Sequence, residues 1–286
     1  MPSLRDIKRR IVSVRKTRQI TRAMRMVAAA KLRRAQEKIL AARPYAEQMV
    51  RTARDVVAAN TEVEHPLLAK RERIAKLDLV VILSDRGLAG AFNTNVLKTA
   101  QRVIDAREPE LDAISLVLVG RKAGDYFRRR RPAAIVHGEA FGEATPEKAA
   151  ALARLLAERY VKGEADETIV VYSEFVSALS QQPREVRLFP GLSQAHEQVA
   201  DHTPFAAEPD AQRLLDLLLP KVLEVAVYRA LLESQAGEYA ARMTAMESAT
   251  RNGEEMIDSL TLKFNRARQA AITKELMEII GGAEAL

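Results

Sequence analysis

Apolar residues at the N-terminal end of the chain recur at spacings of three and four. This spacing places them on one stripe of a helix that packs lengthwise on another helix. Small alanine side chains are frequent on the stripe, so the partner helix can approach closely. The stripe runs between residues 3 and 60 through Leu4, Ile7, Ile11, Val14, Arg18, Thr21, Arg25, Ala28, Leu32, Ala35, Ile39, Ala42, Ala46, Met49, Ala53 and Val56.

Three polar residues interrupt this stripe at Arg18, Thr21 and Arg25. The neighbouring apolar positions are Ile20, Met24 and Val27, which suggests that the stripe slides around the helix here. A slide of this kind changes the local winding of a coiled coil. Pro44 predicts a kink or break farther along, because proline cannot donate the helical hydrogen bond.

A second helix is predicted from about residue 210 to residue 280. About 70 helical residues would form a rod of about 105 Å. Pro220 predicts a kink in its first turns, and Gly281-Gly282 predicts its end. Its stripe runs through Val222, Val225, Arg229, Leu232, Ala236, Tyr239, Met243, Met246, Thr250, Gly253, Ile257, Leu260, Phe264, Ala267 and Ala271.

The middle of the chain alternates between two kinds of segment. Helical patterns fall at 93–107, 121–129 and 145–161, and β-rich runs fall at 77–84, 114–120, 134–137, 168–175 and 184–189. This alternation predicts a small, mostly parallel α/β sheet. Residues 191–209 are rich in polar and turn residues, which favours a loop or linker.

These segments predict an α/β protein with a long antiparallel coiled coil. Residues 1–60 and 210–286 form the coiled coil, and a small Rossmann-like α/β domain at 76–190 is inserted between them. The second helix would be longer by about 15 residues, or roughly 20 Å. Its projecting tip at 270–280 is apolar on more than one face, so it needs an apolar sleeve from another protein.

Positive charge is concentrated at the start of the chain. Residues 1–34 contain 12 basic residues and one acid, Asp6, so this segment carries a charge of +11. The net charge of the chain is +7, so the remaining residues together carry −4. Nucleic acid, anionic lipid and acidic protein surfaces are all possible partners of such a face. Interleaved aromatic residues and nucleic-acid-reading motifs are missing. Docking onto acidic protein loops therefore fits best, because the other edge of this helix is committed to the stripe.

Catalytic chemistry has little support in the sequence. The chain has no cysteine, and its four histidines are scattered. Residues 84–90, SDRGLAG, follow a predicted strand and precede a helix, but they lack the spacing of glycine-rich phosphate loops. We interpret them as a structural turn and expect no catalytic residue, metal or cofactor. A nucleotide-using α/β enzyme with helical dimerisation arms remains an alternative, as does a nucleic-acid-associated coiled coil.

No apolar run approaches the length of about 18 residues that spans a bilayer. The N-terminal segment has no apolar core like that of a signal peptide. Its Arg-rich, acid-poor composition raises the possibility of a mitochondrial transit peptide, but the same pattern continues for about 50 residues. We therefore expect a mature, cytoplasmic chain.

Several motifs resemble the gamma subunit, or central stalk, of bacterial F-type ATP synthases. They are residues 21–32 (TRAMRMVAAAKL), 43–45 (RPY), 84–90, 241–246 (ARMTAM), 249–250 (AT), 252–253 (NG) and 264–276 (FNRARQAAITKEL). The resemblance covers both terminal helices and the order of the whole chain. It implies a non-catalytic rotor that couples proton flow through a membrane ring to ATP synthesis or hydrolysis, and that regulates ATPase activity.

The resemblance also implies partners and residue roles. The partners would be alternating catalytic beta and non-catalytic alpha subunits, an epsilon subunit and the c subunits of the proton ring, with no nucleic acid and no small-molecule substrate. The chain would lie peripherally on the cytoplasmic face of the bacterial membrane and, without the chloroplast cysteine pair, would lack thiol regulation. Rotor coupling would involve Met24, Glu238, Arg242, Gln269, Thr273 and Glu275. The basic bearing face would consist of Arg9, Arg10, Arg22, Lys31, Arg33 and Arg34. Contact with the membrane ring would involve Glu208 and Asp210.

Overall fold

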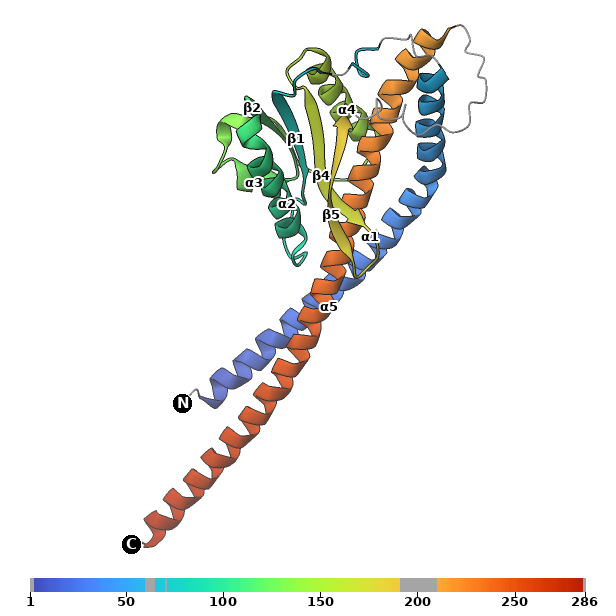
Figure 1. Ribbon diagram of the computed structural model, residues 1–286. Coiled ribbons are helices and arrows are strands. Elements are labelled where there is room, and N and C mark those ends of the chain that lie inside the picture. Colours follow the sequence, from blue (N-terminus) through green and yellow to red (C-terminus); the bar gives the residue numbers. More distant parts are fainter. Residues whose placement is uncertain (1–2, 60–64, 70, 191–209, 285–286) are drawn as a thin grey trace. The chain divides into compact units, whose positions relative to one another are not determined.

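The computed structural model describes residues 3–59, 65–69, 71–190 and 210–284 (Figure 1). The chain divides into two compact units. Unit 1 consists of Met1–Ala29 and Arg242–Leu286, and unit 2 consists of Ala30–Ala241. Both terminal helices contribute to both units, so each unit is described by itself.

The two long helices are α1, Leu4–Ala59, and α5, Ala211–Glu284. Ser3 and Asp6 form a reciprocal cap at the start of α1, in which the Ser3 Oγ accepts from the Asp6 N–H at 3.2 Å and the Asp6 carboxylate accepts from the Ser3 N–H at 3.3 Å. Asp210 caps α5 by accepting from the Arg213 N–H at 2.8 Å.

Neither proline ends its helix, because α1 continues through Pro44 and α5 through Pro220, so the alternative of a break at Pro44 is wrong. Pro44 is exposed, so water can bind the carbonyl that loses its helical donor. The helix end expected at Gly281-Gly282 is also wrong, since α5 reaches Glu284. Glycine lowers helix stability by about 1 kcal/mol relative to alanine but does not forbid the helix.

Unit 2 contains a five-stranded sheet with the order β3-β2-β1-β4-β5. The first four strands are parallel and β5 is antiparallel to β4, which confirms the predicted mixed α/β fold. The strands are β1 Lys76–Ile82, β2 Ala113–Val119, β3 Ile135–Glu139, β4 Glu167–Phe175 and β5 Gln181–Phe189. The connecting helices are α2 Phe92–Arg107, α3 Arg121–Phe127 and α4 Pro146–Val161, with short 3-10 turns at Glu108–Glu110 and Pro132–Ala134.

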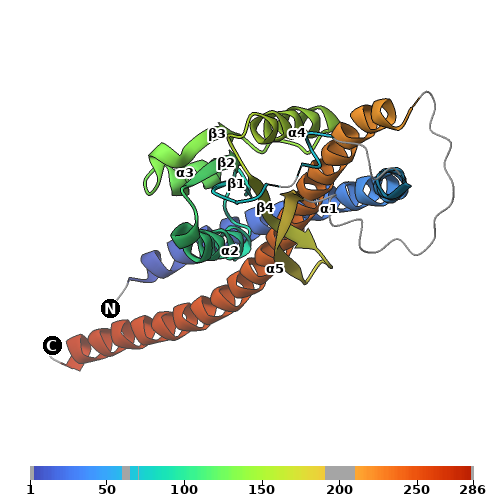
Figure 2. The same ribbon diagram turned by 45° about the horizontal axis from the view of Figure 1, so that its top comes forward.

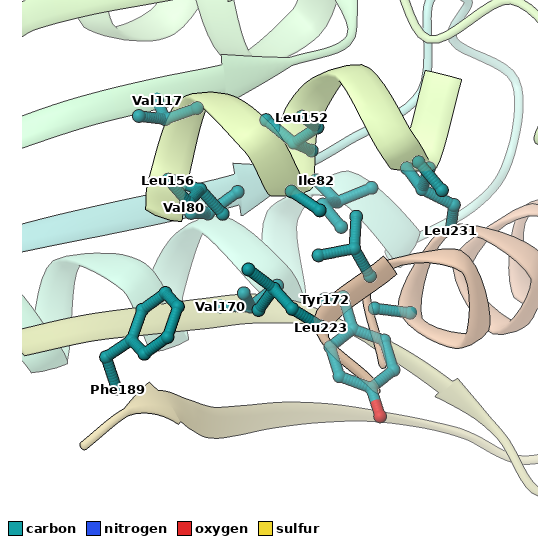
Figure 3. Packing of buried hydrophobic residues seen from close by; sticks show 14 of the residues in the cluster. Val80, Ile82, Val117, Leu152, Leu156, Val170, Tyr172, Phe189, Leu223 and Leu231 are labelled. Atoms are coloured by element: carbon teal, nitrogen blue, oxygen red, sulfur yellow. The ribbon is translucent and has the colours of Figure 1, made fainter. Parts of the chain in front are cut away.

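Each face of the sheet has its own apolar core, because neighbouring residues of a strand point to opposite faces. Figure 2 shows α2 and α3 on one face and α4 on the other. On the first face, Leu79 and Leu118 pack with Val96 and Ile104 of α2. On the second face, strand residues such as Val80, Val117 and Val170 pack with α4 and α5 (Figure 3). The end of α1 belongs to the same core. The sheet is therefore covered on both faces, as a parallel sheet requires.

Candidate functional site

A polar section lies within the helix pair of unit 1. Thr21 of α1 and Thr250 of α5 have hydroxyl oxygens 2.8 Å apart. Toward one side, Arg25 donates from Nη1 to Glu247 at 2.8 Å. Toward the other side, Arg18 Nη1 lies 3.6 Å from Glu254. Residue numbers rise along α1 as they fall along α5, so the helices run antiparallel.

These three pairs correct the expected slide of the stripe. Ile20 and Val27 are 60% and 57% exposed, so the packed stripe does not move onto them. Thr21 is buried, and Ala28 and Ile11 are buried on either side of it. The stripe keeps its spacing because each polar residue finds a partner on α5, which offsets the cost of placing it there.

The pairing register sets where the predicted coupling residues lie. Paired residue numbers add up to about 272. Met24 is half-buried on α1 and lies opposite the region of Glu247. Gln269, Thr273 and Glu275 are exposed and fall beyond the start of α1 at Leu4. The structure therefore does not bring Met24 beside these three residues.

The other two predicted coupling residues lie nearer the polar section in sequence. Arg242 is half-buried within unit 1, whereas Glu238 is buried within unit 2. Each has a polar or charged interaction in the structure.

The end of α5 carries apolar side chains that no part of unit 1 covers. Leu276 and Met277 are 54% and 64% exposed, and Ile272 and Ile280 are also exposed. The register pairs Leu4, the first residue of α1, with a position near residue 268. The final turns of α5 therefore have no α1 residues opposite them, and they present an unpartnered apolar surface.

All six residues of the predicted basic bearing face are exposed. Arg9, Arg10 and Arg22 belong to unit 1, and Lys31, Arg33 and Arg34 belong to unit 2. Several are partly engaged, since the Lys31 ammonium lies 5.5 Å from the Tyr239 ring centroid and Arg33 donates to Glu37 at 3.2 Å. Arg18 and Arg25 of the same segment instead pair with glutamates of α5 in the polar section.

The Asp85 carboxylate ties the turn at residues 84–90 to neighbouring segments by hydrogen bonds. Asp85 accepts hydrogen bonds from the backbone N–H groups of Arg121 at 2.9 Å, Phe141 at 2.9 Å and Gly142 at 2.8 Å. Burial alone would raise the pKa of Asp85, but the three backbone hydrogen bonds outweigh it and hold the pKa below its ordinary value. A bound phosphate would need N–H groups of this kind, and here Asp85 already uses them.

Two further predictions concern the start of α5 and metal binding. Asp210 is exposed and caps α5, whereas Glu208 and the loop expected at 191–209 lie outside the described residues. Among the residues that the structure describes, no three His, Cys, Asp or Glu side chains gather in a way that could hold a metal ion.

The comparisons with known proteins agree over the whole chain. The sequence model of the family described as ATP synthase matches residues 3–286. An ATP synthase gamma chain from Anaeromyxobacter sp. (strain K) is 50% identical over 291 residues, with 100% of both chains covered. The chain belongs to the ATP synthase gamma chain family. A gamma chain from Heliobacterium modesticaldum is 48% identical over 294 residues and is also fully covered.

Solved structures of similar fold are rotor parts of mitochondrial ATP synthases. The chain matches a central stalk/c-ring structure from Tetrahymena thermophila with a TM-score of 0.62 and 25% identity, covering 80% of this chain and 99% of that one. It matches a rotor structure from Euglena gracilis with a TM-score of 0.67 and 21% identity, covering 94% and 98%. The second likeness concerns the fold alone.

Proposed function

We propose that this gamma-family chain is the central rotor shaft of an F-type ATP synthase. It would couple proton flow through the membrane ring to ATP synthesis or hydrolysis at the catalytic hexamer, and would regulate ATPase activity without catalysing a reaction itself. The observation that carries this proposal is the antiparallel helix pair of unit 1, with its polar section and bare apolar tip, in a chain that matches gamma chains along its full length.

The helix pair has the physical properties that a shaft needs. An asymmetric shaft changes the conformation of each catalytic site only if it contacts the different states with different free energies. Such contacts are reproducible only when the two helices keep one register. The paired side chains of the polar section supply this register, as polar residues do in other coiled coils.

The surface of the pair supplies two kinds of contact. The apolar tip of α5 would enter an apolar sleeve formed by the alpha and beta subunits. The basic bearing face would meet acidic loops of the same subunits through exposed contacts that salt screens. Met24, Glu238, Arg242, Gln269, Thr273 and Glu275 would transmit the rotation, each by contact with the surrounding ring or with the neighbouring helix.

Attachment to the membrane would be indirect. No helix within the described residues has the length and hydropathy of a bilayer span. The similarity to bacterial gamma chains supports our proposal of a peripheral position on the cytoplasmic face of a bacterial membrane, where the chain would contact the c subunits and an epsilon subunit. Glu208 and Asp210, near the start of α5, are the proposed contacts with the c ring.

Co-purification tests the proposal directly. A tagged chain should co-purify with alpha and beta subunits in a hexamer, and ATPase activity should appear only in that complex. A chain that hydrolyses ATP alone, or that never assembles with the hexamer, would contradict the proposal.

The alternatives make different predictions. A nucleotide-using enzyme would bind ATP at residues 84–90, but the filled N–H groups around Asp85 disfavour this site. A nucleic-acid-associated coiled coil would bind duplex DNA with a steep salt dependence at physiological ionic strength.

A further inference from the structure

A second cluster of charged residues lies in unit 2, between α2 and the edge of the sheet. A cleft of about 500 Å³ opens there, which is within the range of small-molecule sites. Val103, Ala106 and Ile169 form its apolar part, and Glu185 lies on it. Three guanidinium groups line the same cleft, from Arg102 and Arg107 of α2 and from Arg187 of β5.

A fully buried carboxylate fixes two of these arginines. Glu167 at the start of β4 has no solvent exposure. It pairs with Arg107 Nη2 through one oxygen and with Arg187 Nε through the other, the latter at 2.6 Å. One carboxylate neutralises only one of the two guanidinium groups, whose side chains are 24% and 41% exposed and can be reached from the cleft.

The remaining donors point to a missing acceptor. The Arg107 Nε–H is buried and has no hydrogen-bond acceptor among the described residues, while the Glu167 Oε1 lies close to Arg187 without hydrogen-bond geometry. Each guanidinium has five N–H donors, and Glu167 occupies few of them. Arg102 is held only loosely, at 3.6 Å from Glu185, and both side chains are largely exposed. The cleft thus has three guanidinium groups against two carboxylates, a formal excess of one positive charge.

We propose that this cleft binds a small phosphate, either inorganic phosphate or a phosphate monoester, between Arg102, Arg107 and Arg187. Guanidinium groups bind phosphate oxygens through paired, charge-assisted hydrogen bonds. A tetrahedral anion presents oxygens in diverging directions, so it can accept from arginines on two different elements. A planar carboxylate offers only two oxygens and satisfies fewer of these donors. The site is separate from the helix pair, and the rotor role does not depend on it.

Glu185 would compete with a bound phosphate for Arg102 in this cleft. Its carboxylate pairs with Arg102, which a bound phosphate would also use. Replacing it with glutamine removes the competing charge and keeps the size of the side chain. This change should strengthen phosphate binding, an outcome that a damaged fold would not produce.

The test is a calorimetric titration of the full chain with inorganic phosphate, at constant ionic strength maintained with chloride. We expect saturable binding at one site per chain. Arg102→Gln and Arg187→Gln should each weaken it about tenfold, the loss of one charge-assisted hydrogen bond. Glu185→Gln should tighten it about threefold or more. Arg102 contacts no buried carboxylate, so its variant keeps the test valid if Arg187→Gln misfolds.

Arg184→Gln is the matched control. Arg184 lies on β5 three residues before Arg187, hence on the opposite face of the strand, and pairs there with Glu174 at 2.7 Å. Its loss should leave phosphate binding unchanged. Equal weakening by Arg184→Gln and Arg187→Gln would show non-specific attraction and overturn the proposal. So would an absence of saturable binding, weaker binding by a folded Glu185→Gln, or binding to phosphatidylglycerol vesicles without binding to free phosphate.

Discussion

Thr21 and Thr250 are 229 residues apart in the sequence, yet their hydroxyl oxygens lie 2.8 Å apart. Thr21 is also within hydrogen-bonding distance of the Arg18 carbonyl, at 3.0 Å, and Thr250 of the Met246 carbonyl, at 2.7 Å. The two threonines have only two hydroxyl hydrogens for these three oxygen–oxygen contacts. One threonine therefore donates across the helix pair while the other donates to its own helix.

The threonine pair predicts strong coupling between two substitutions. Thr250→Val should lower the free energy of unfolding by about 1 kcal/mol, because it leaves the Thr21 hydroxyl partly buried without its partner. Thr21→Val should act similarly. The double variant should recover most of this loss, since two valines of the same shape pack together. Urea unfolding of the four proteins measures the interaction energy, and simple additivity of the single effects would contradict the prediction.

Replacing Gly253, which lies beside Arg18 in the polar section, should stabilise the helix pair. A Cβ atom at this position would lie 3.5 Å from the Arg18 Cβ, an ordinary contact. Gly253→Ala should therefore raise the free energy of unfolding by about 0.5–1 kcal/mol. Gly120→Ala is the contrasting control, because Gly120 has φ +100° and its Cβ would lie 2.0 Å from the Leu83 carbonyl oxygen. It should destabilise strongly, and equal effects of the two variants in thermal unfolding would refute this interpretation.

The sequence predicts the stripe and strands well because both depend on local spacing. Ile7, Ile11, Leu32 and Ala35 all lie on the expected stripe and are buried. The slide predicted around Arg18, Thr21 and Arg25 is wrong because the partners of these residues lie more than 220 residues away in the sequence. A signal existed nevertheless. Arg18, Thr21 and Arg25 are spaced by three and four residues, and so are Glu247, Thr250 and Glu254, with opposite charges at both ends.

Asp85 shows a second limit of the sequence. The place of residues 84–90 between a strand and a helix predicts a turn, but the three N–H groups that bind the Asp85 carboxylate belong to α3 and to the segment after β3. Only the folded sheet brings these segments together. The pattern therefore located the turn and missed the residue that organises it.

Asp85 predicts a pH-dependent loss of stability. Its folded-state pKa is lowered relative to an unfolded value of about 3.9. The ionised group therefore stabilises the fold fully above about pH 5, and this contribution declines as the pH falls through the folded-state pKa. Asp85→Asn should cost about 2 kcal/mol at pH 7 and progressively less below about pH 4. Asp125→Asn, at an exposed carboxylate paired with Lys122 at 3.4 Å, is the control for urea unfolding at several pH values.

Met24 predicts an effect on coupling rather than on catalysis. Met24→Lys places a new charge on a half-buried position next to the polar section, where it would compete with Arg25 for Glu247 or meet the surrounding ring. We expect fewer protons pumped per ATP hydrolysed in membrane vesicles. Met26→Lys, at an exposed position of the same turn, should have a smaller effect. Normal pumping in Met24→Lys would count against a coupling role.

The exposed tip of α5 predicts self-association of the isolated chain. Leu276→Ser with Met277→Ser removes two exposed apolar side chains and should reduce association in sedimentation experiments at high concentration. The same double variant should assemble less readily with the hexamer if the tip enters the proposed apolar sleeve. Unchanged assembly would mean that the tip contributes little binding free energy.

The constant sum of paired residue numbers has a consequence for how the gene can change length. Removing one codon from one helix, between the polar pairs and the inserted domain, turns the paired side chains by about 100° relative to their partners, so the three polar pairs would be lost together. Removing seven codons from one helix restores nearly the same angle but shifts the helix by about 10.5 Å, so the pairs survive only if the other helix also loses seven residues. Extra codons in the turns of the inserted domain leave this pairing unaffected. Insertions and deletions should therefore accumulate in the insert, while the two helices change length there only together, in matched steps of seven.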